Sequence, residues 1–309
     1  ATPTIRFNGV VGGTNPVGAI AITGALDLDA IIQKTSDSSA GATSLTVSGV
    51  SNLGANVNTS GIQTYTGAVT LSGADRTLTG STITTNGTIV GGANSLTITG
   101  NAVFGDATTD TVTGVKILSV SGNTTVHTNT ITTSGTQTYG DNAASDTITL
   151  GNSTTFTTTD SQITFNGTVN SEGSETNSLT LGVGSSEVEF NGAVGGGRTL
   201  NAIAITGALD LNAAITNTVS LTVSGASNLG ANVTASGNSQ TYSGPVTLSA
   251  DTTLTDAGNI LFSSTVDGGF ALTIVNSGTG DVTFTDAVGG TTALTGLTIT
   301  TDVLTAAAI

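Results

Sequence analysis

The feature that most constrains the fold is a repeat that fills the chain. The decapeptide AIAITGALDL occupies residues 19–28 and returns unchanged at residues 202–211. Longer echoes surround both copies: FNGVVGG (7–13) and FNGAVGG (190–196) before them, SLTVSGVSNLGANV (44–57) and SLTVSGASNLGANV (220–233) after them. A structural unit that stacks on similar units recurs along the chain in this way, whereas a catalytic motif seldom recurs. We therefore expect one repetitive domain over residues 1–309, with long copies at approximately 7–79 and 190–255 and weaker repeats between and after them.

A finer pattern of apolar–Thr/Ser–apolar triplets recurs inside the long repeat. Examples are Leu45-Thr46-Val47, Val69-Thr70-Leu71 and Leu96-Thr97-Ile98. Alternation with a period of two places apolar side chains on one face of a strand and Thr on the other. Residues 25–33 also show helical spacing, but their second copy reads as strand, so we predict strand for both. The second copy lacks a short segment around Lys34 to Ala42, which predicts a loop insertion in the first.

Short strands separated by Gly-containing turns predict an all-β fold, a parallel β-solenoid (β-helix). Its interior would hold ladders of Val, Ile, Leu and Phe, with Thr, Ser and Asn outside and Gly or Asn at the corners. The alternative is a tandem array of β-sandwiches. The two decapeptides start at residues 19 and 202, and this separation is close to the combined length of two sandwich domains of about 90–100 residues each. The absence of Trp and the 4% aromatic content favour the solenoid. About 12–15 coils, each advancing about 4.8 Å, would give a rod roughly 60–75 Å long.

Composition narrows the partners of the chain. Five basic residues and a net charge of −15 argue against nucleic acid and anionic membrane surfaces as partners. No apolar run is long enough for a membrane-spanning helix. Cys and Met are absent, and Ala1 is not followed by a signal-peptide pattern. We expect a processed, exported chain or a piece of a longer one, located outside the cell or at the cell surface.

The repeats resemble those of large bacterial surface proteins. FNGAVGG, TLTITG, SNLGANV and QTYTGAVTL are similar to the Gly/Thr/Asn-rich repeats of filamentous-haemagglutinin-like and autotransporter-type adhesins, and the likeness extends over nearly all 309 residues. That resemblance implies a secreted parallel β-helix. The NPNL-type secretion motif of the two-partner exoproteins has no match here, since the chain reads Asn15-Pro16-Val17.

Residues that could carry chemistry are few, and we expect neither an enzyme nor a cofactor. His127 is the only histidine and alternates with Thr, which is typical of a surface strand. The four glutamates, Glu172, Glu175, Glu187 and Glu189, could form a glycosidase pair, but a loop plus one strand face is the favoured interpretation. Two acidic loops offer weak Ca²⁺ candidates in Asp106, Asp110, Asp141 and Asp146, although solvated turns explain them better.

Three surface patterns remain as alternatives. Thr-x-Thr units could form a flat ice-binding array; examples are those at 97–99, 111–113, 147–149, 283–285 and 298–300. Their number also follows from the strand propensity of Thr. Six glycosylation sequons begin at Asn58, Asn86, Asn123, Asn152, Asn166 and Asn232. The tyrosines of three QTY units, Tyr65, Tyr139 and Tyr242, indicate a core or corner feature in preference to a sugar platform.

The two ends of the chain suggest a function. Residues 4–9 enter the strand pattern at once, and residues 301–309 leave it on an apolar run, so neither looks like a cap. We expect a structural protein whose partner is itself, joined end to end by strand pairing into a filament or sheath. The alternative is an adhesin stalk or passenger segment of a larger secreted protein, with host or cell-surface glycans as partners. An ice- or glycan-binding solenoid is a more distant alternative.

Overall fold

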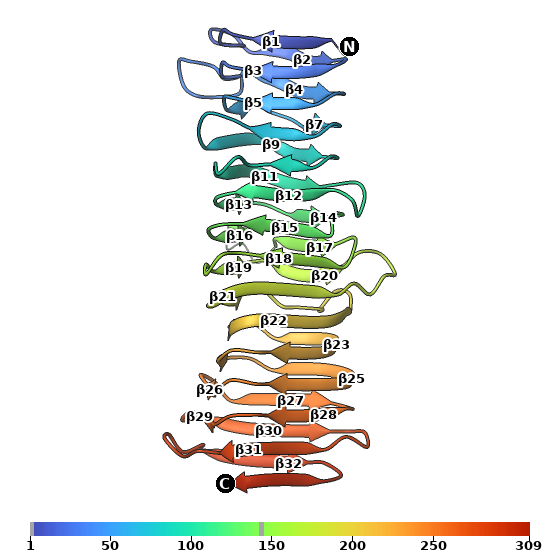
Figure 1. The fold of residues 1–309 in the computed structure, drawn as a ribbon, viewed down its shortest axis with the longest axis vertical. Coiled ribbons are helices and arrows are strands. Elements are labelled where there is room, and N and C mark those ends of the chain that lie inside the picture. Colours follow the sequence, from blue (N-terminus) through green and yellow to red (C-terminus); the bar gives the residue numbers. More distant parts are fainter. Residues whose placement is uncertain (1–2, 142–144) are drawn as a thin grey trace. The chain divides into compact units, whose positions relative to one another are not determined.

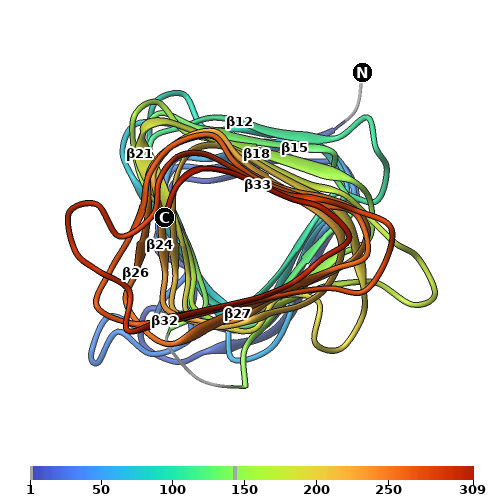
Figure 2. The same ribbon diagram turned by 90° about the horizontal axis from the view of Figure 1, so that it is seen from below.

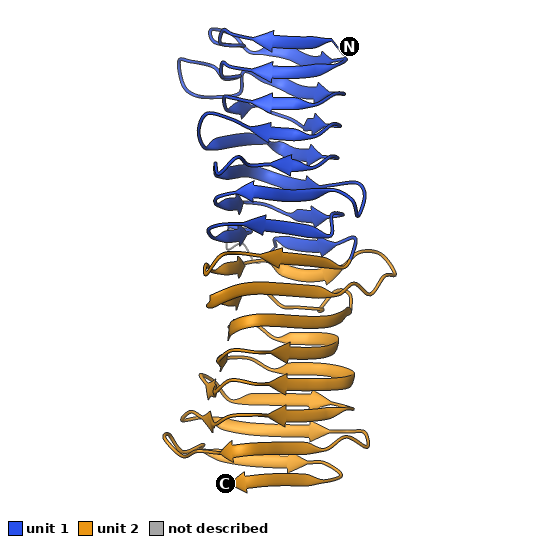
Figure 3. Ribbon diagram, viewed as in Figure 1, with its two compact units in different colours: residues 1–152 blue, residues 153–309 orange. Residues whose placement is uncertain are grey.

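The chain folds entirely from parallel β-strands that stack in about 14 turns (Figure 1). The structure, a computed structural model, describes residues 3–141 and 145–309, and it contains no helix in these ranges. Contacts divide the chain into two compact units, Ala1–Asn152 and Ser153–Ile309 (Figure 3). Each unit is a β-solenoid, as predicted. The tandem-sandwich alternative is wrong, because sandwich strands pair in antiparallel fashion whereas these ladders are parallel.

The first unit is built from short strands that form three parallel ladders. Its strands are β1 (Thr4–Phe7), β2 (Val17–Ile22), β3 (Ala25–Leu28), β4 (Ala42–Val47), β5 (Ser51–Leu53), β6 (Val57–Asn58), β7 (Gln63–Tyr65), β8 (Val69–Leu71), β9 (Arg76–Thr85), β10 (Ile89–Val90), β11 (Leu96–Phe104), β12 (Thr111–Val115), β13 (Leu118–Val120), β14 (Thr124–Val126), β15 (Thr130–Thr133), β16 (Gln137–Tyr139) and β17 (Thr147–Leu150).

Each coil of the first unit contributes one segment to each ladder. Ladder A runs β1-β3-β5-β8-β10-β12-β15. Ladder B begins with bridges from Val11 to Ile32 to Val57 and continues through β6, the first half of β9, the first half of β11, β13 and β16. Ladder C runs β2-β4-β7, then through the second halves of β9 and β11 to β14 and β17.

The second unit repeats this plan. Its strands are β18 (Thr154–Thr157), β19 (Ile163–Phe165), β20 (Thr168–Ser171), β21 (Leu179–Phe190), β22 (Leu200–Leu211), β23 (Ile215–Val223), β24 (Ser227–Leu229), β25 (Val233–Tyr242), β26 (Val246–Leu248), β27 (Thr252–Asp256), β28 (Asn259–Phe262), β29 (Val266–Asp267), β30 (Ala271–Asn276), β31 (Val282–Ala287), β32 (Gly296–Thr300) and β33 (Leu304–Ala308).

Three ladders organise these strands as well. Ladder D runs β18-β21-β22-β23-β25-β28-β31-β33. Ladder E runs from β19 through the second halves of β21 and β22 to β24, β26, β29 and a bridge at Val288. Ladder F joins Val169, Val194 and Ile215 by bridges and continues through Val233 to β27, β30 and β32. Figure 2 shows the coils end-on, with strands along the sides and loops at the corners.

Apolar side chains fill the interior of each unit in register. In ladder D, Tyr242, Phe262 and Phe284 are fully or almost fully buried and stack face to face, with ring centroids 5.2 and 4.8 Å apart. The residues between inward positions point outward and are mostly Thr, Ser or Asn, as the period-two pattern predicts. Burial of these ladders is the main stabilising contribution, since a single coil cannot cover its own apolar face.

The repeated decapeptide turns a corner in both copies. In the first it joins β2 to β3 through Gly24, whose φ is 128°, and in the second it crosses β22 through Gly207, whose φ is 132°. A Cβ on Gly24 would lie 2.4 Å from the carbonyl oxygen of Pro3, so only glycine fits. Residues 25–28 are strand and the insertion after Gln33 is a loop, both as predicted, whereas residues 29–33 form only isolated bridges at Ile32 and Gln33 and not the predicted strand. The decapeptide therefore recurs because it shapes a corner.

Candidate functional site

His127 is engaged through its backbone at the end of β14. Its N–H donates to the carbonyl oxygen of Phe104 at 2.9 Å, and its own carbonyl accepts a hydrogen bond from the side chain of Asn152. Both contacts tie one coil to its neighbour. In the described part of the chain, no three His, Cys, Asp or Glu side chains gather closely enough to hold a metal ion.

The glutamates lie on one strand face and one loop, as the favoured interpretation predicted. Glu187 and Glu189 both point outward from β21, where the side chain of Gln162 donates to each of them, at 3.1 and 3.3 Å. Glu175 lies in the loop after β20 and accepts from the side chain of Asn177 at 3.0 Å. Glu187 and Glu189 are two residues apart on one strand, so their side chains lie next to each other. A glycosidase pair requires two carboxyl groups that face each other across a cleft, and these two do not.

The two acidic loops use their carboxylates to close their own turns. Asp110 accepts hydrogen bonds from the backbone N–H groups of Asp106 and Ala107, at 3.2 and 3.1 Å. Asp146 accepts from the N–H of Asp141 at 3.1 Å, although part of that loop lies outside the described residues. These bonds give both loops a structural role, and their capacity for Ca²⁺ stays a prediction.

The Thr-x-Thr units do not gather into one array. In the first unit, the units at 97–99, 111–113 and 147–149 belong to ladders B, A and C respectively, and so occupy three different faces. In the second unit, those at 283–285 and 298–300 belong to ladders D and F. A flat ice-binding surface needs such units in register on many successive coils, which these five units do not provide. A further unit, at 77–79, is in register with 97–99, but this pair covers two coils of ladder B only.

The QTY units are part of the core, as predicted. Tyr65, Tyr139 and Tyr242 are completely buried, and each hydroxyl donates to the carboxamide oxygen of the Gln two residues earlier, at 2.9, 2.9 and 3.1 Å. Burial raises the pKa of each tyrosine far above its ordinary value. A platform for stacking a sugar needs an exposed ring, so these tyrosines do not form one.

Most sequon asparagines are held by hydrogen bonds within their own unit. The side-chain oxygens of Asn123, Asn232 and Asn166 accept from Thr147, Thr253 and Asn191, at 2.9, 2.8 and 3.0 Å. The side chain of Asn58 donates to the carbonyl of Ser38 at 2.8 Å. These bonds join successive coils or brace a loop, so a glycan at such a position would have to displace one. Glycosylation stays a prediction.

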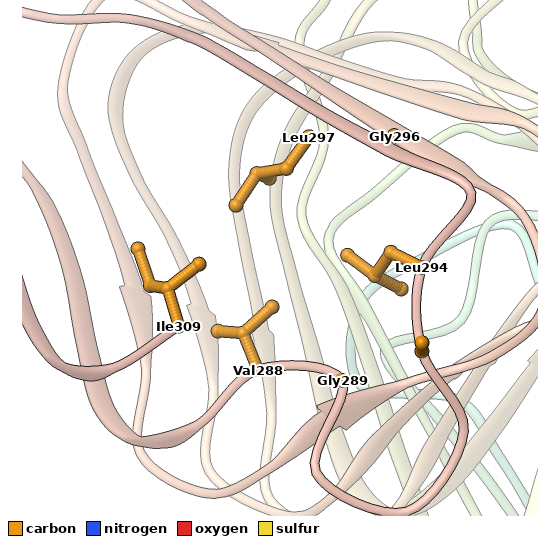
Figure 4. Close-up of a pocket in the computed structure, with 7 residues that line it drawn as sticks. Val288, Gly289, Leu294, Gly296, Leu297 and Ile309 are labelled. Carbon is orange, nitrogen blue, oxygen red and sulfur yellow. The ribbon is translucent and has the colours of Figure 1, made fainter.

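The last layer of the second unit leaves strand edges and apolar side chains uncovered. Within the described chain, β33 pairs only with β31 and β32 only with β30. Leu304 is 44% exposed, although its partner one layer inward, Val282, is fully buried. Beside these strands is an apolar cavity of about 280 Å³, lined by Val288, Gly289, Ala293, Leu294, Gly296, Leu297 and Ile309 (Figure 4).

The first layer of the first unit is open in the same way. Among the described residues, β1 pairs only with β3 and β2 only with β4. Ile5 is 41% exposed, whereas its partner in the next layer, Leu26, is buried. The sequence predicted uncapped strand edges, but it did not reveal the cavity, because residues from separate segments of the chain line it.

Comparisons with known proteins add no assignment. No protein family, no curated protein and no solved structure matches the chain. No helix in the described residues has the length and apolar character needed to cross a membrane.

Proposed function

We propose that the chain is an extracellular, cell-surface structural protein that assembles with copies of itself, end to end, into a filament or sheath. It carries out no catalysis. The pair of open layers supports this most directly. The outer edge of each layer has backbone groups without a partner among the described strands, and its inward-pointing apolar side chains are more exposed than the corresponding side chains of inner layers. Such an edge is a template for another strand.

The open layers favour a head-to-tail contact between different surfaces. The two open layers are the first described layer of the first unit and the last layer of the second unit, so the contact surfaces are not the same patch. A heterologous contact of this kind does not close on itself, and repetition produces a filament. Continuation of the parallel ladders across the contact also requires a head-to-tail arrangement. Two identical layers joined to each other would place antiparallel strands next to each other.

The distribution of charge supports the same polarity. Residues 1–152 contain four basic and eight acidic side chains, whereas residues 153–309 contain one basic and twelve acidic ones. Two C-terminal layers brought together would therefore join two strongly acidic units. A head-to-tail contact instead places the more acidic unit against the less acidic one, in whose first layer Arg6 is paired with Asp27 and Asp29 of the next layer. Like-charge repulsion thus disfavours the symmetric contact.

Self-assembly can be tested on the full chain in solution. Sedimentation velocity over a hundredfold range of concentration should reveal species whose mass grows with concentration, and electron microscopy should show unbranched filaments. Single chains that stay monodisperse at the highest concentration would contradict the proposal and favour the adhesin-segment alternative. Labelling of intact cells with an antibody to the chain tests the location: surface signal without permeabilisation is expected.

A further inference from the structure

We propose that the joint forms when β1 of a second copy adds in parallel to the free edge of β32, with Ile5 closing the apolar cavity beside Leu297. This inference rests on the proposed function and specifies which strands meet. In this joint the solenoid continues from one copy into the next. The second copy is rotated so that its ladder A adds to ladder F of the first copy and not to ladder D. Three observations carry it: the path of the chain, the apolar side chains and the cavity.

The path of the chain selects β32 among the free edges. Successive segments of the second unit pass from ladder D to E to F, and β33 is the last strand on ladder D. Ile309 follows it and lines the cavity together with Val288, the last residue of ladder E. The next position in this order is on ladder F, above β32. A strand placed there continues the winding without skipping a position.

The first unit supplies its free edges in a matching order. Its chain passes from β1 to the Val11 segment and then to β2. With β1 on β32, the Val11 segment lies over β33 and β2 lies over the Val288–Ile309 region. With β1 on β33 instead, the position above β32 on ladder F would stay empty, and the N–H and C=O groups of β32 would be buried without partners. Unpaired buried backbone groups are costly, so the addition of β1 to β32 is favoured.

The inward side chains of the two strands are complementary. Leu297 and Ile299 are in register with the buried Leu272 and Ile274, which makes them the inward residues of β32. Ile5 and Phe7 are in register with Leu26 and Leu28, which makes them the inward residues of β1. Aligning the first inward residue of each strand places Ile5 over Leu297 and Phe7 over Ile299. The outward residues Arg6 and Thr298 then become neighbours.

The cavity has the size and chemistry for one aliphatic side chain. Val288, Leu294, Leu297 and Ile309 point into the same space, as Figure 4 shows, and the cavity measures about 280 Å³. An apolar cavity of about 150 Å³ accepts a molecule as large as benzene. The side chain of Ile5 therefore fits, and its transfer from water into this space is favourable.

Engineered cysteines test the register directly, because the chain has no cysteine of its own. A chain with Arg6→Cys is mixed with a chain carrying Thr298→Cys and then oxidised. Adjacent strands bring the two Cα atoms within the roughly 4.4–6.8 Å that a disulfide spans. We expect mixed disulfide dimers, identified by mass spectrometry of the linked peptides. The matched control mixes Arg6→Cys with Thr305→Cys, the outward residue of β33, and should give at least tenfold less mixed dimer.

The outcomes separate the joint from the proposed function. Association with cross-linking through Thr305, or through neither position, would overturn the β1–β32 joint and leave end-to-end assembly standing. Absence of association in the unmodified chain would overturn both. Ile5→Lys gives an independent test: it should raise the dissociation constant at least tenfold, because a charged group would enter the cavity. Val50→Lys, at an exposed position in the middle of the first unit, should leave association unchanged, with circular dichroism as the folding control for both.

Discussion

At the corners of both units, glycines lie directly over one another in successive coils. Gly24, Gly49 and Gly67 form such a column in the first unit, where the N–H of Gly49 donates to the carbonyl of Gly24 at 2.8 Å. Gly207, Gly225 and Gly244 form another in the second unit. The backbones approach so closely that a Cβ would overlap the layer below. This explains why the sequence keeps glycine in its repeated phrases.

Substitution within such a column should be much more harmful than substitution at an open glycine. A Cβ on Gly244 would lie 2.4 Å from the carbonyl of Gly225, whereas a Cβ on Gly269 would meet nothing within 4 Å. Gly244→Ala should therefore lower the free energy of unfolding by about 1–3 kcal/mol, the usual cost of overpacking. Gly269→Ala, the control, should change it by about 0.5 kcal/mol or less. Urea titration measures both, and equal effects would refute the column.

Asp256 is a carboxyl group in the core of the second unit. It is fully buried close to Tyr242; one oxygen accepts from the N–H of Gly258 at 2.9 Å, and the other has no hydrogen-bond partner. Burial raises the pKa of this carboxyl, and the backbone N–H groups of Gly258 and Ala257 together with the side chain of Gln240 offset part of that rise. Its contribution to stability is therefore full below the ordinary aspartate pKa of about 3.9 and is lost as the pH rises through the raised native value.

Asp256→Asn should remove this pH dependence, because the amide stays neutral. The melting temperature of the variant, relative to the parent chain, should increase as the pH rises above about 3.9 and level off once the pH exceeds the raised native pKa. The difference increases because the parent chain is destabilised at the higher pH, where the carboxyl group ionises and the native core disfavours the carboxylate. Differential scanning calorimetry across this range measures the difference. A difference that is constant with pH would contradict the assignment.

At the scale of strands, period-two alternation was enough to predict the parallel ladders and their apolar interiors. Triplets such as Leu45-Thr46-Val47 bury their outer members and expose the middle one, as expected. The assignment of a triplet to a particular ladder was not predictable, because loops of different length separate the strands. The loop of residues 105–110 follows β11, for example, whereas β13 and β14 are separated by a turn of three residues. Thr-x-Thr units alike in sequence thus face different ways.

The aromatic stack in ladder D should be a major source of stability. Phe262 lies between Tyr242 and Phe284, and the adjacent rings are within 10° of parallel. Phe262→Ala leaves a cavity that both neighbours line, and should lower the free energy of unfolding by about 3–5 kcal/mol. Phe270→Ala offers a control in the same unit, since Phe270 is partly exposed and should cost much less. Chemical denaturation of both variants checks the difference, and similar losses would contradict the interior stack.

At the scale of the whole molecule, each layer depends on its neighbours for both hydrogen bonds and apolar cover. The uncapped strand pattern of residues 4–9 and 301–309 was visible in the sequence, and both segments form layers whose outer edge pairs with no strand of the described residues. The cavity was not foreseeable, because it combines Val288, a loop residue at 294, β32 and Ile309 from separate segments. The proposed assembly through these layers accounts for both the open edges and the exposed apolar side chains with one contact.

Cryo-electron microscopy of the assembled chain tests that account most directly. At a resolution that separates strands, the stacking of parallel strands about 4.8 Å apart should continue without a gap across the junction between copies. β1 of one copy should lie on β32 of the next, with Ile5 against Leu297. Side-by-side packing of the copies, or a junction without strand pairing, would contradict the account.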